Sequence, residues 1–208
     1  HRGDLPEEDE RRRVFEDAVA FESLHVTRKD RFLLQDIPVR VEYKSIDRFN
    51  EIIRAAEGNR GIYRDSGTYM FYRIKNSTIL RQKSDWLPEV RKDLSAFTDE
   101  FWEQLRSLFQ ARMEHYLGDL HAAVIREDPL FYLVSASGFI RSVASVLFAV
   151  NRRFEPAPRS FLERVPELAI LPDSFHGRFD SFLRTENGLS QDRKLEVATL
   201  LAQSVIAL

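Results

Sequence analysis

The strongest candidates for chemistry lie at the end of a long apolar segment, where Asn151, Arg152 and Arg153 follow residues 147–150. Arg141 precedes them in the same segment. Arg presents a rigid fork of donors that matches a phosphate or a carboxylate, so these residues suit an anion-binding site. Basic residues at a helix end also complement the partial negative charge of its C-terminus. The pattern therefore predicts either a substrate-binding cluster of these four residues or a basic helix end.

A second candidate is Glu42, on the polar face of a predicted strand in which Val39, Val41 and Tyr43 alternate with charged residues. A carboxylate on a strand can hold Mg²⁺ near a phosphate if one or two further carboxylates converge on it. A lone carboxylate on a strand is more often solvated or paired with a base on the neighbouring strand. The sequence leaves both explanations open.

Several other classes of site are excluded or disfavoured by composition. The chain has 208 residues and no Cys, which excludes disulfides, thiolate zinc sites and Cys nucleophiles. Its five His residues form no HExxH motif, and no G-x-S-x-G motif occurs. Only Gly3 precedes Gly58, so the N-terminal part has no glycine-rich phosphate loop. A net charge of −2 gives no indication of a nucleic-acid partner.

The sequence gives no indication of a membrane partner. The most apolar stretch, residues 130–149, contains Arg141 and several Ser residues, so it predicts a buried helix. Residues 1–4 lack an apolar signal region and an initiator Met. We therefore expect a cytoplasmic protein and a chain that is a piece of a longer one.

The elements that would position these residues belong to an α+β fold. Apolar periodicity predicts a small antiparallel or mixed sheet with helices over residues 1–90 and a C-terminal helix bundle over residues 91–208. The predicted strands include residues 32–34 and 39–43, joined by a turn at Gln35 and Asp36, and a hairpin over residues 62–74. The predicted helices cover residues 14–24, 48–57 (capped by Asp47), 98–126 (capped by Thr98), 129–154 (capped by Asp128, with Pro129 in its first turn), 160–168, 175–184 and 190–208 (capped by Ser190).

Three segments carry a resemblance to a known superfamily: residues 37–43 (Ile-Pro-Val-Arg-Val-Glu-Tyr), 61–68 (Gly-Ile-Tyr-Arg-Asp-Ser-Gly-Thr) and 148–156 (Phe-Ala-Val-Asn-Arg-Arg-Phe-Glu-Pro). They resemble, in order, the strand with the third catalytic carboxylate, the hairpin before the linker and the helix end of nucleotidyltransferases. More narrowly, the chain resembles uncharacterised bacterial proteins of this superfamily with a kanamycin-nucleotidyltransferase-like helical C-terminal domain.

The resemblance implies transfer of a nucleoside monophosphate from a nucleoside triphosphate to the hydroxyl of an unknown acceptor. It also implies Mg²⁺ held by three carboxylates, of which Glu42 would be the third. The Gly-Ser turn and the Asp-x-Asp pair of the superfamily are absent upstream of Glu42. We therefore expect either the C-terminal portion of an enzyme or a degenerate relative, inactive as this fragment in both cases.

Two non-catalytic functions are alternatives. The helical part could be an interaction module, for which an exposed apolar patch and dimerisation would be evidence. It could instead be a module that binds a small molecule or nucleotide through Arg141, Asn151, Arg152 and Arg153. An Arg-x4-6-His nuclease motif is not supported, because Arg112 and His115 are only three positions apart.

Overall fold

The chain has the predicted α+β class in a computed structural model that describes residues 5–15, 18–24, 28–57, 68–184 and 188–208. It divides into two compact units, residues 1–60 and residues 61–208, called here the N-terminal unit and the helical unit. The domains predicted from the sequence were residues 1–90 and 91–208. Each unit is described by itself.

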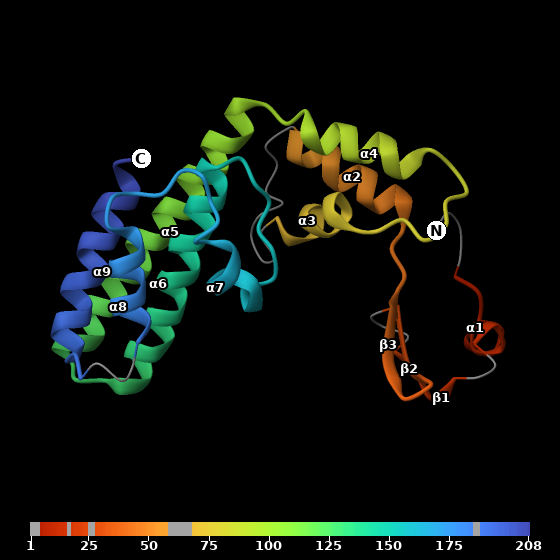
Figure 1. The fold of residues 1–208 in the computed structure, drawn as a ribbon, viewed down its shortest axis with the longest axis horizontal. Helices are drawn as coiled ribbons and strands as arrows, with labels where there is room; N and C mark the ends of the chain where they lie inside the picture. The colour runs from red at the N-terminus through yellow and green to blue at the C-terminus, as the bar shows by residue number, and fades with distance from the viewer. Residues whose placement is uncertain (1–4, 16–17, 25–27, 58–67, 185–187) are drawn as a thin grey trace. The chain divides into compact units, whose positions relative to one another are not determined.

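The N-terminal unit contains a three-stranded antiparallel sheet in the order β1-β2-β3 (Figure 1). Gln35 and Asp36 join β2 to β3 with φ angles of 49° and 63°, as the twist of a two-residue hairpin requires. This confirms the predicted turn. The elements of the unit are α1 (Glu8–Val14), β1 (Val19–Leu24), β2 (Lys29–Leu34), β3 (Ile37–Glu42) and α2 (Ile46–Glu57).

Two sequence predictions in this unit were wrong. Residues 14–24 were predicted to be helical, but α1 ends at Val14 and β1 pairs with β2. Cross-strand pairing overrides helix propensity here, since propensity is a weak prior. Asp47 was predicted to cap α2. The helix begins one residue earlier, and the Ser45 hydroxyl accepts the Arg48 N–H at 3.3 Å instead.

A buried ion pair joins α1 to the sheet. The Arg11 guanidinium donates to both carboxylate oxygens of Asp30, at 3.0 and 3.1 Å, and to the Ser23 hydroxyl at 2.6 Å. The Tyr43 hydroxyl donates to Asp30 at 2.7 Å. Burial opposes the charged form of Asp30, yet the bonds from Arg11, Tyr43 and Ser23 keep its pKa below the ordinary value. Burial and the adjacent carboxylate raise the pKa of Tyr43 to about 12.

In the helical unit, two long antiparallel helices, α5 and α6, pack side by side, and α8 and α9 pack beside them (Figure 1). Three of its helices begin at the predicted side-chain caps. Thr98 accepts the Phe101 N–H at 3.3 Å, Asp128 accepts that of Phe131 at 2.9 Å, and Ser190 accepts that of Arg193 at 3.3 Å. The helices are α3 (Tyr69–Asn76), α4 (Trp86–Ser95), α5 (Asp99–Ile125), α6 (Pro129–Val150), η2 (Pro158–Ser160), α7 (Phe161–Arg164), α8 (Phe175–Leu183) and α9 (Gln191–Ile206).

The predicted hairpin over residues 62–74 was also wrong where it can be compared. Its first residues lie outside the described chain, and residues 69–74 belong to helix α3. Phe71 on this helix is buried against Phe154 and Phe97, with ring centroids 5.3 and 5.7 Å apart. This aromatic packing stabilises the helix. A run of Tyr, Phe and Ile does not by itself distinguish a helix from a strand.

Helix α6 forms part of the core of the helical unit. It is the one helix of the described chain that is long and apolar enough to cross a membrane by length and composition, and 56% of its most apolar window is buried in the structure. Gly138 allows the Tyr116 ring of α5 to approach closely, because a Cβ at this position would lie 2.4 Å from a ring carbon. The small residue therefore sets the close packing of α5 against α6.

Candidate functional site: a basic cavity

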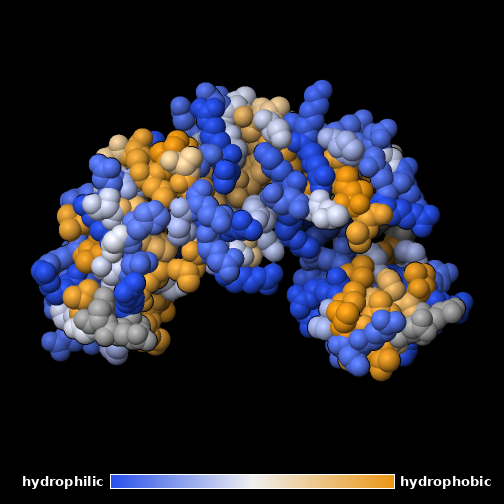
Figure 2. Space-filling model, in the orientation of Figure 1, coloured by the Kyte–Doolittle hydropathy of each residue, from blue (hydrophilic) through white to orange (hydrophobic). Residues whose placement is uncertain are grey.

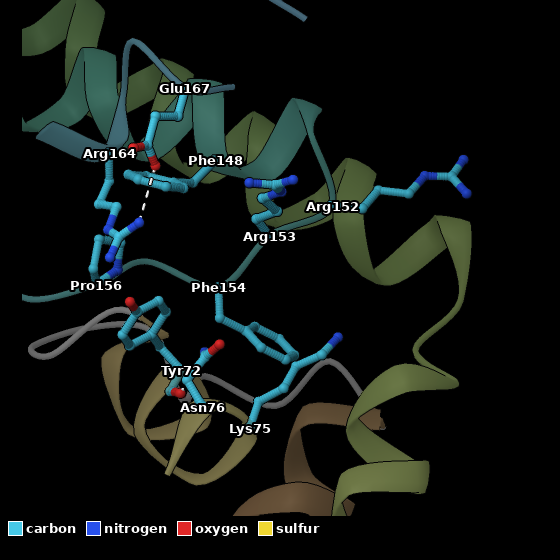
Figure 3. A pocket seen from close by; sticks show the side chains of 10 residues that line it. All are labelled: Tyr72, Lys75, Asn76, Phe148, Arg152, Arg153, Phe154, Pro156, Arg164 and Glu167. Carbon is cyan, nitrogen blue, oxygen red and sulfur yellow. Dashed lines mark hydrogen bonds and ion pairs between the residues drawn. The ribbon is translucent and has the colours of Figure 1, made fainter. Parts of the chain in front are cut away.

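A cavity of about 310 Å³ in the helical unit brings four basic side chains together (Figure 3). We call it the basic cavity. One carboxylate, Glu167, is among its lining residues. The full lining consists of Tyr72, Lys75, Asn76, Phe148, Arg152, Arg153, Phe154, Pro156, Arg164 and Glu167.

Helix α3 supplies one wall through the face that carries Tyr72, Lys75 and Asn76. Residues three and four apart are neighbours on a helix surface, so this spacing presents a hydroxyl, an ammonium and an amide on one side. The Asn76 amide donates to the Tyr72 carbonyl at 2.8 Å, which fixes its position at the end of the helix. The Lys75 ammonium lies 5.6 Å from the centre of the Phe154 ring.

The end of α6 and the residues that follow it supply the opposite wall. The helix is terminated by a turn at Arg152. Arg152 has a φ of 51°, in the left-handed region. The N–H of Arg153 then reaches back to the Phe148 carbonyl at 2.9 Å, as in a common helix ending. α6 therefore ends at Val150, four residues before the predicted end, and residues 152–154 are free to line the cavity.

The two arginines at this turn have different surroundings. Arg152 makes an ion pair with Asp99 at 2.9 Å, and its side chain extends away from the other lining residues (Figure 3). Both partners are largely exposed, so this pair contributes little to stability. The Arg153 side chain makes no hydrogen bond or ion pair with any residue of the described chain, and it lies on the Phe148 side of the cavity.

The fourth base, Arg164, is partly neutralised. Its guanidinium donates to the Glu167 carboxylate at 3.0 Å, and this bond raises the pKa of Arg164 above the ordinary value. The positive charge of the basic cavity that lacks an acidic partner therefore comes from Lys75 and Arg153, within the part of the chain that the structure describes.

The predicted four-residue cluster is only half assembled. Arg152 and Arg153 line the basic cavity, whereas Arg141 borders two other hollows. Asn151 has a structural role, since its amide donates to the carbonyls of Leu147 and Ile170 and accepts the Ile170 N–H, each at 2.8 Å. It thereby attaches a loop 19 residues later to the end of α6.

Sequence reasoning missed the α3 residues Tyr72, Lys75 and Asn76, together with Arg164 and Glu167. Residues 62–74 were predicted to form a hairpin, so Tyr72 was not expected to share a helical face with Lys75 and Asn76. Read as a helix, the same residues would have shown a polar stripe. α3 ends at Asn76 and α6 ends at Val150, and nothing in the sequence signalled that these distant segments lie close together.

Glu42 is paired rather than available. Its Oε1 lies 3.3 Å from the ammonium of Lys29 on the neighbouring strand and 3.2 Å from that of Lys44. Mg²⁺ at the implied site would need further oxygen ligands from the protein. The described residues contain no group of three or more His, Asp or Glu side chains that could hold a metal ion. The described part of the chain therefore does not fit the implied metal, and the role of Glu42 stays a prediction.

Comparison with known proteins adds no relative. No protein-family model matches this chain, and no curated protein or solved structure is significantly similar to it.

Proposed function

We propose that the helical unit binds a phosphorylated small molecule in the basic cavity, with a nucleoside triphosphate as the first candidate. The observation that carries this proposal is that Lys75 and Arg153, on segments far apart in sequence, line one cavity without an acidic partner in the described chain. Two unpaired cations that share a cavity repel each other, and an anion between them relieves this cost.

The remaining lining residues suit the same ligand. Arg153 offers a bidentate fork, and Lys75 offers a mobile point charge, which are the two common ways in which proteins hold phosphate oxygens. Tyr72, which is half-buried, adds aromatic surface on which a planar base can stack. The volume of about 310 Å³ lies at the lower end of the range of small-molecule pockets, roughly 300–1,000 Å³.

Nucleotidyl transfer remains the proposal for a longer protein of which this chain would be the C-terminal portion. The third segment of the resemblance, residues 148–156, supplies five lining residues of the basic cavity. In this proposal the chain contributes nucleotide binding, and the acceptor is unknown. We expect these 208 residues to transfer no labelled nucleotide from any of the four ribonucleoside triphosphates with Mg²⁺ or Mn²⁺. Measurable turnover would contradict this expectation.

Calorimetric titration of the chain with ATP and with pyrophosphate tests the binding proposal. We expect saturable binding of both, weakened about tenfold by Arg153→Ala, which corresponds to the loss of one charge-assisted hydrogen bond. Arg126→Ala is the matched control, because Arg126 is exposed at the end of α5 and does not line the cavity. Equal affinities for all three proteins would favour the helix-end explanation of the basic residues.

A further inference from the structure

Away from the basic cavity, residues of α6 lie between two further hollows, one apolar and one polar. The apolar hollow has a volume of about 740 Å³ and is lined by Ile140 and Ala144 of α6 and by residues of α7 and α8. The polar hollow has a volume of about 470 Å³ and lies along α5 and α6. Ser137 and Arg141, one helical turn apart, line both.

The walls of the apolar hollow are suited to a hydrocarbon chain. Its apolar lining is provided by Ile140, Ala144, Phe161, Leu162, Phe179 and Leu183. Leu162 and Leu183 remain 65% and 38% exposed, so apolar surface is left uncovered within the chain itself. Figure 2 shows hydrophobic surface next to hydrophilic surface over the part of the helical unit where α6 and α8 lie. Covering such surface is favourable in proportion to its area.

The charges at the border of the hollow point to the head group. The Arg141 guanidinium makes no hydrogen bond or ion pair with any described residue, although it is placed between the two hollows. Arg184, at the apolar hollow, is paired with Asp180 at 3.3 Å. Arg141 is therefore the cation at this border that is available to a ligand.

The polar hollow adds a second arginine, a histidine and one carboxylate. Arg112 and His115 line it beside Arg141. His115 lies 3.5 Å from Asp119. Glu155 also lines it, but its oxygens accept from the Ser145 hydroxyl at 2.5 Å and from the Thr68 N–H at 3.1 Å. These bonds direct the Glu155 oxygens toward Ser145 and Thr68.

From this juxtaposition we propose that α6 carries a second binding site, for a medium-chain fatty acid anion. The alkyl chain occupies the apolar hollow and the carboxylate pairs with Arg141. This site is separate from the basic cavity and does not depend on the function proposed for it. The guanidinium matches a carboxylate in a bidentate manner, which distinguishes an acid from a neutral molecule with the same chain.

Titration of the full chain with hexanoate, octanoate and decanoate below their micellar concentrations tests the proposal, with octanamide as the neutral counterpart of octanoate. We expect saturable binding that strengthens roughly threefold to fourfold per added methylene. Arg141→Gln should weaken octanoate binding about tenfold and leave octanamide binding within about twofold. Arg126→Gln, which removes an exposed charge outside both hollows, should leave octanoate binding unchanged.

A second pair of variants tests the position of the alkyl chain. Leu162→Ala should weaken decanoate binding about fivefold to tenfold, because it removes exposed wall of the apolar hollow. Leu133→Ala is the matched control, since Leu133 is 66% exposed but lines neither hollow. Three outcomes would overturn the proposal: no saturable binding of decanoate, equal effects of Arg141→Gln on octanoate and octanamide, or binding to anionic lipid vesicles without binding to free decanoate.

Discussion

Arginine has contrasting surroundings in the two units of this chain. In the N-terminal unit, Arg11 is 6% exposed and donates to Asp30, Ser23 and the Pro6 carbonyl. In the helical unit, Arg153 is exposed, lines a cavity and has no hydrogen-bond or ion-pair partner among the described residues. A satisfied, buried guanidinium holds elements together, whereas one without a partner in a cavity is available to a ligand. The comparison indicates that the surroundings of an arginine, more than its presence, separate structure from binding.

The largest effect is expected where the ion pair of the N-terminal unit is broken. Asp30→Ala leaves the Arg11 guanidinium buried without its carboxylate, which should destabilise this unit by about 3–5 kcal/mol in urea unfolding followed by circular dichroism. The double variant Arg11→Met with Asp30→Leu removes both charges and should be markedly less destabilised than Asp30→Ala. A double variant as unstable as the single one would show that the charges themselves are required.

A smaller loss is expected for the polar network that joins α3 to α6 inside the helical unit. Glu155→Ala leaves the Thr68 N–H, the Thr68 hydroxyl and the Ser145 hydroxyl without an acceptor, at a cost of about 1–3 kcal/mol. Ser142→Ala is the control, because Ser142 is equally buried at 5% but bonds only to a carbonyl of its own helix. Equal unfolding free energies for the two variants would show that the Glu155 network does not stabilise the helical unit.

The same comparison predicts a pH dependence of the stability of the N-terminal unit. The folded-state pKa of Asp30 is lowered, so its contribution is complete above its ordinary pKa, about 4, and is lost as the pH falls through the folded value. The folded-state pKa of Tyr43 is raised to about 12, so its contribution is complete below pH 10 and is lost between about pH 10 and 12. Urea midpoints measured across both ranges should fall at each end. Both falls in the urea midpoint should be smaller for the Arg11→Met/Asp30→Leu variant.

The smallest effect is expected for the stability of the cavity variants. Arg153→Ala should change the unfolding free energy by no more than about 0.5 kcal/mol, as is usual for an exposed side chain without partners. Thermal unfolding of the variant beside the unaltered chain provides the measurement. A loss of several kcal/mol would mean that Arg153 has a structural role, as Arg11 does.

The helical unit was the more predictable part of the fold, because local signals define its helices. Thr98, Asp128 and Ser190 cap helices where the sequence placed them, and Pro129 opens α6. The errors fell at residues 14–24 and at residues 69–74 of the predicted hairpin, where short runs of aromatic and aliphatic residues fit a helix or a strand equally well. There the outcome depends on pairing with β2 or on burial of Phe71, which are non-local contacts.

Residues of the candidate site were predictable where the helices that carry them were predicted correctly. Arg152 and Arg153 follow directly from the end of a well-marked helix. Lys75 was missed because the residues directly before it, 62–74, were predicted to form a hairpin. Arg141 was included because residues on one helix were assumed to act together. Asn151 was interpreted as a ligand residue, but its amide is committed to the Ile170 backbone. Proximity between distant segments is set by packing, which one sequence does not reveal.

Titration of pyrophosphate into four proteins tests the central claim most directly: the unaltered chain, Lys75→Ala, Arg153→Ala and the double variant. The account predicts saturable binding by the unaltered chain, about tenfold weaker binding by each single variant, and no measurable binding by the double variant at the same concentrations. Circular dichroism spectra should be the same for all four. Pyrophosphate affinities that do not differ among the four proteins, or an unaltered chain that fails to bind, would contradict the account.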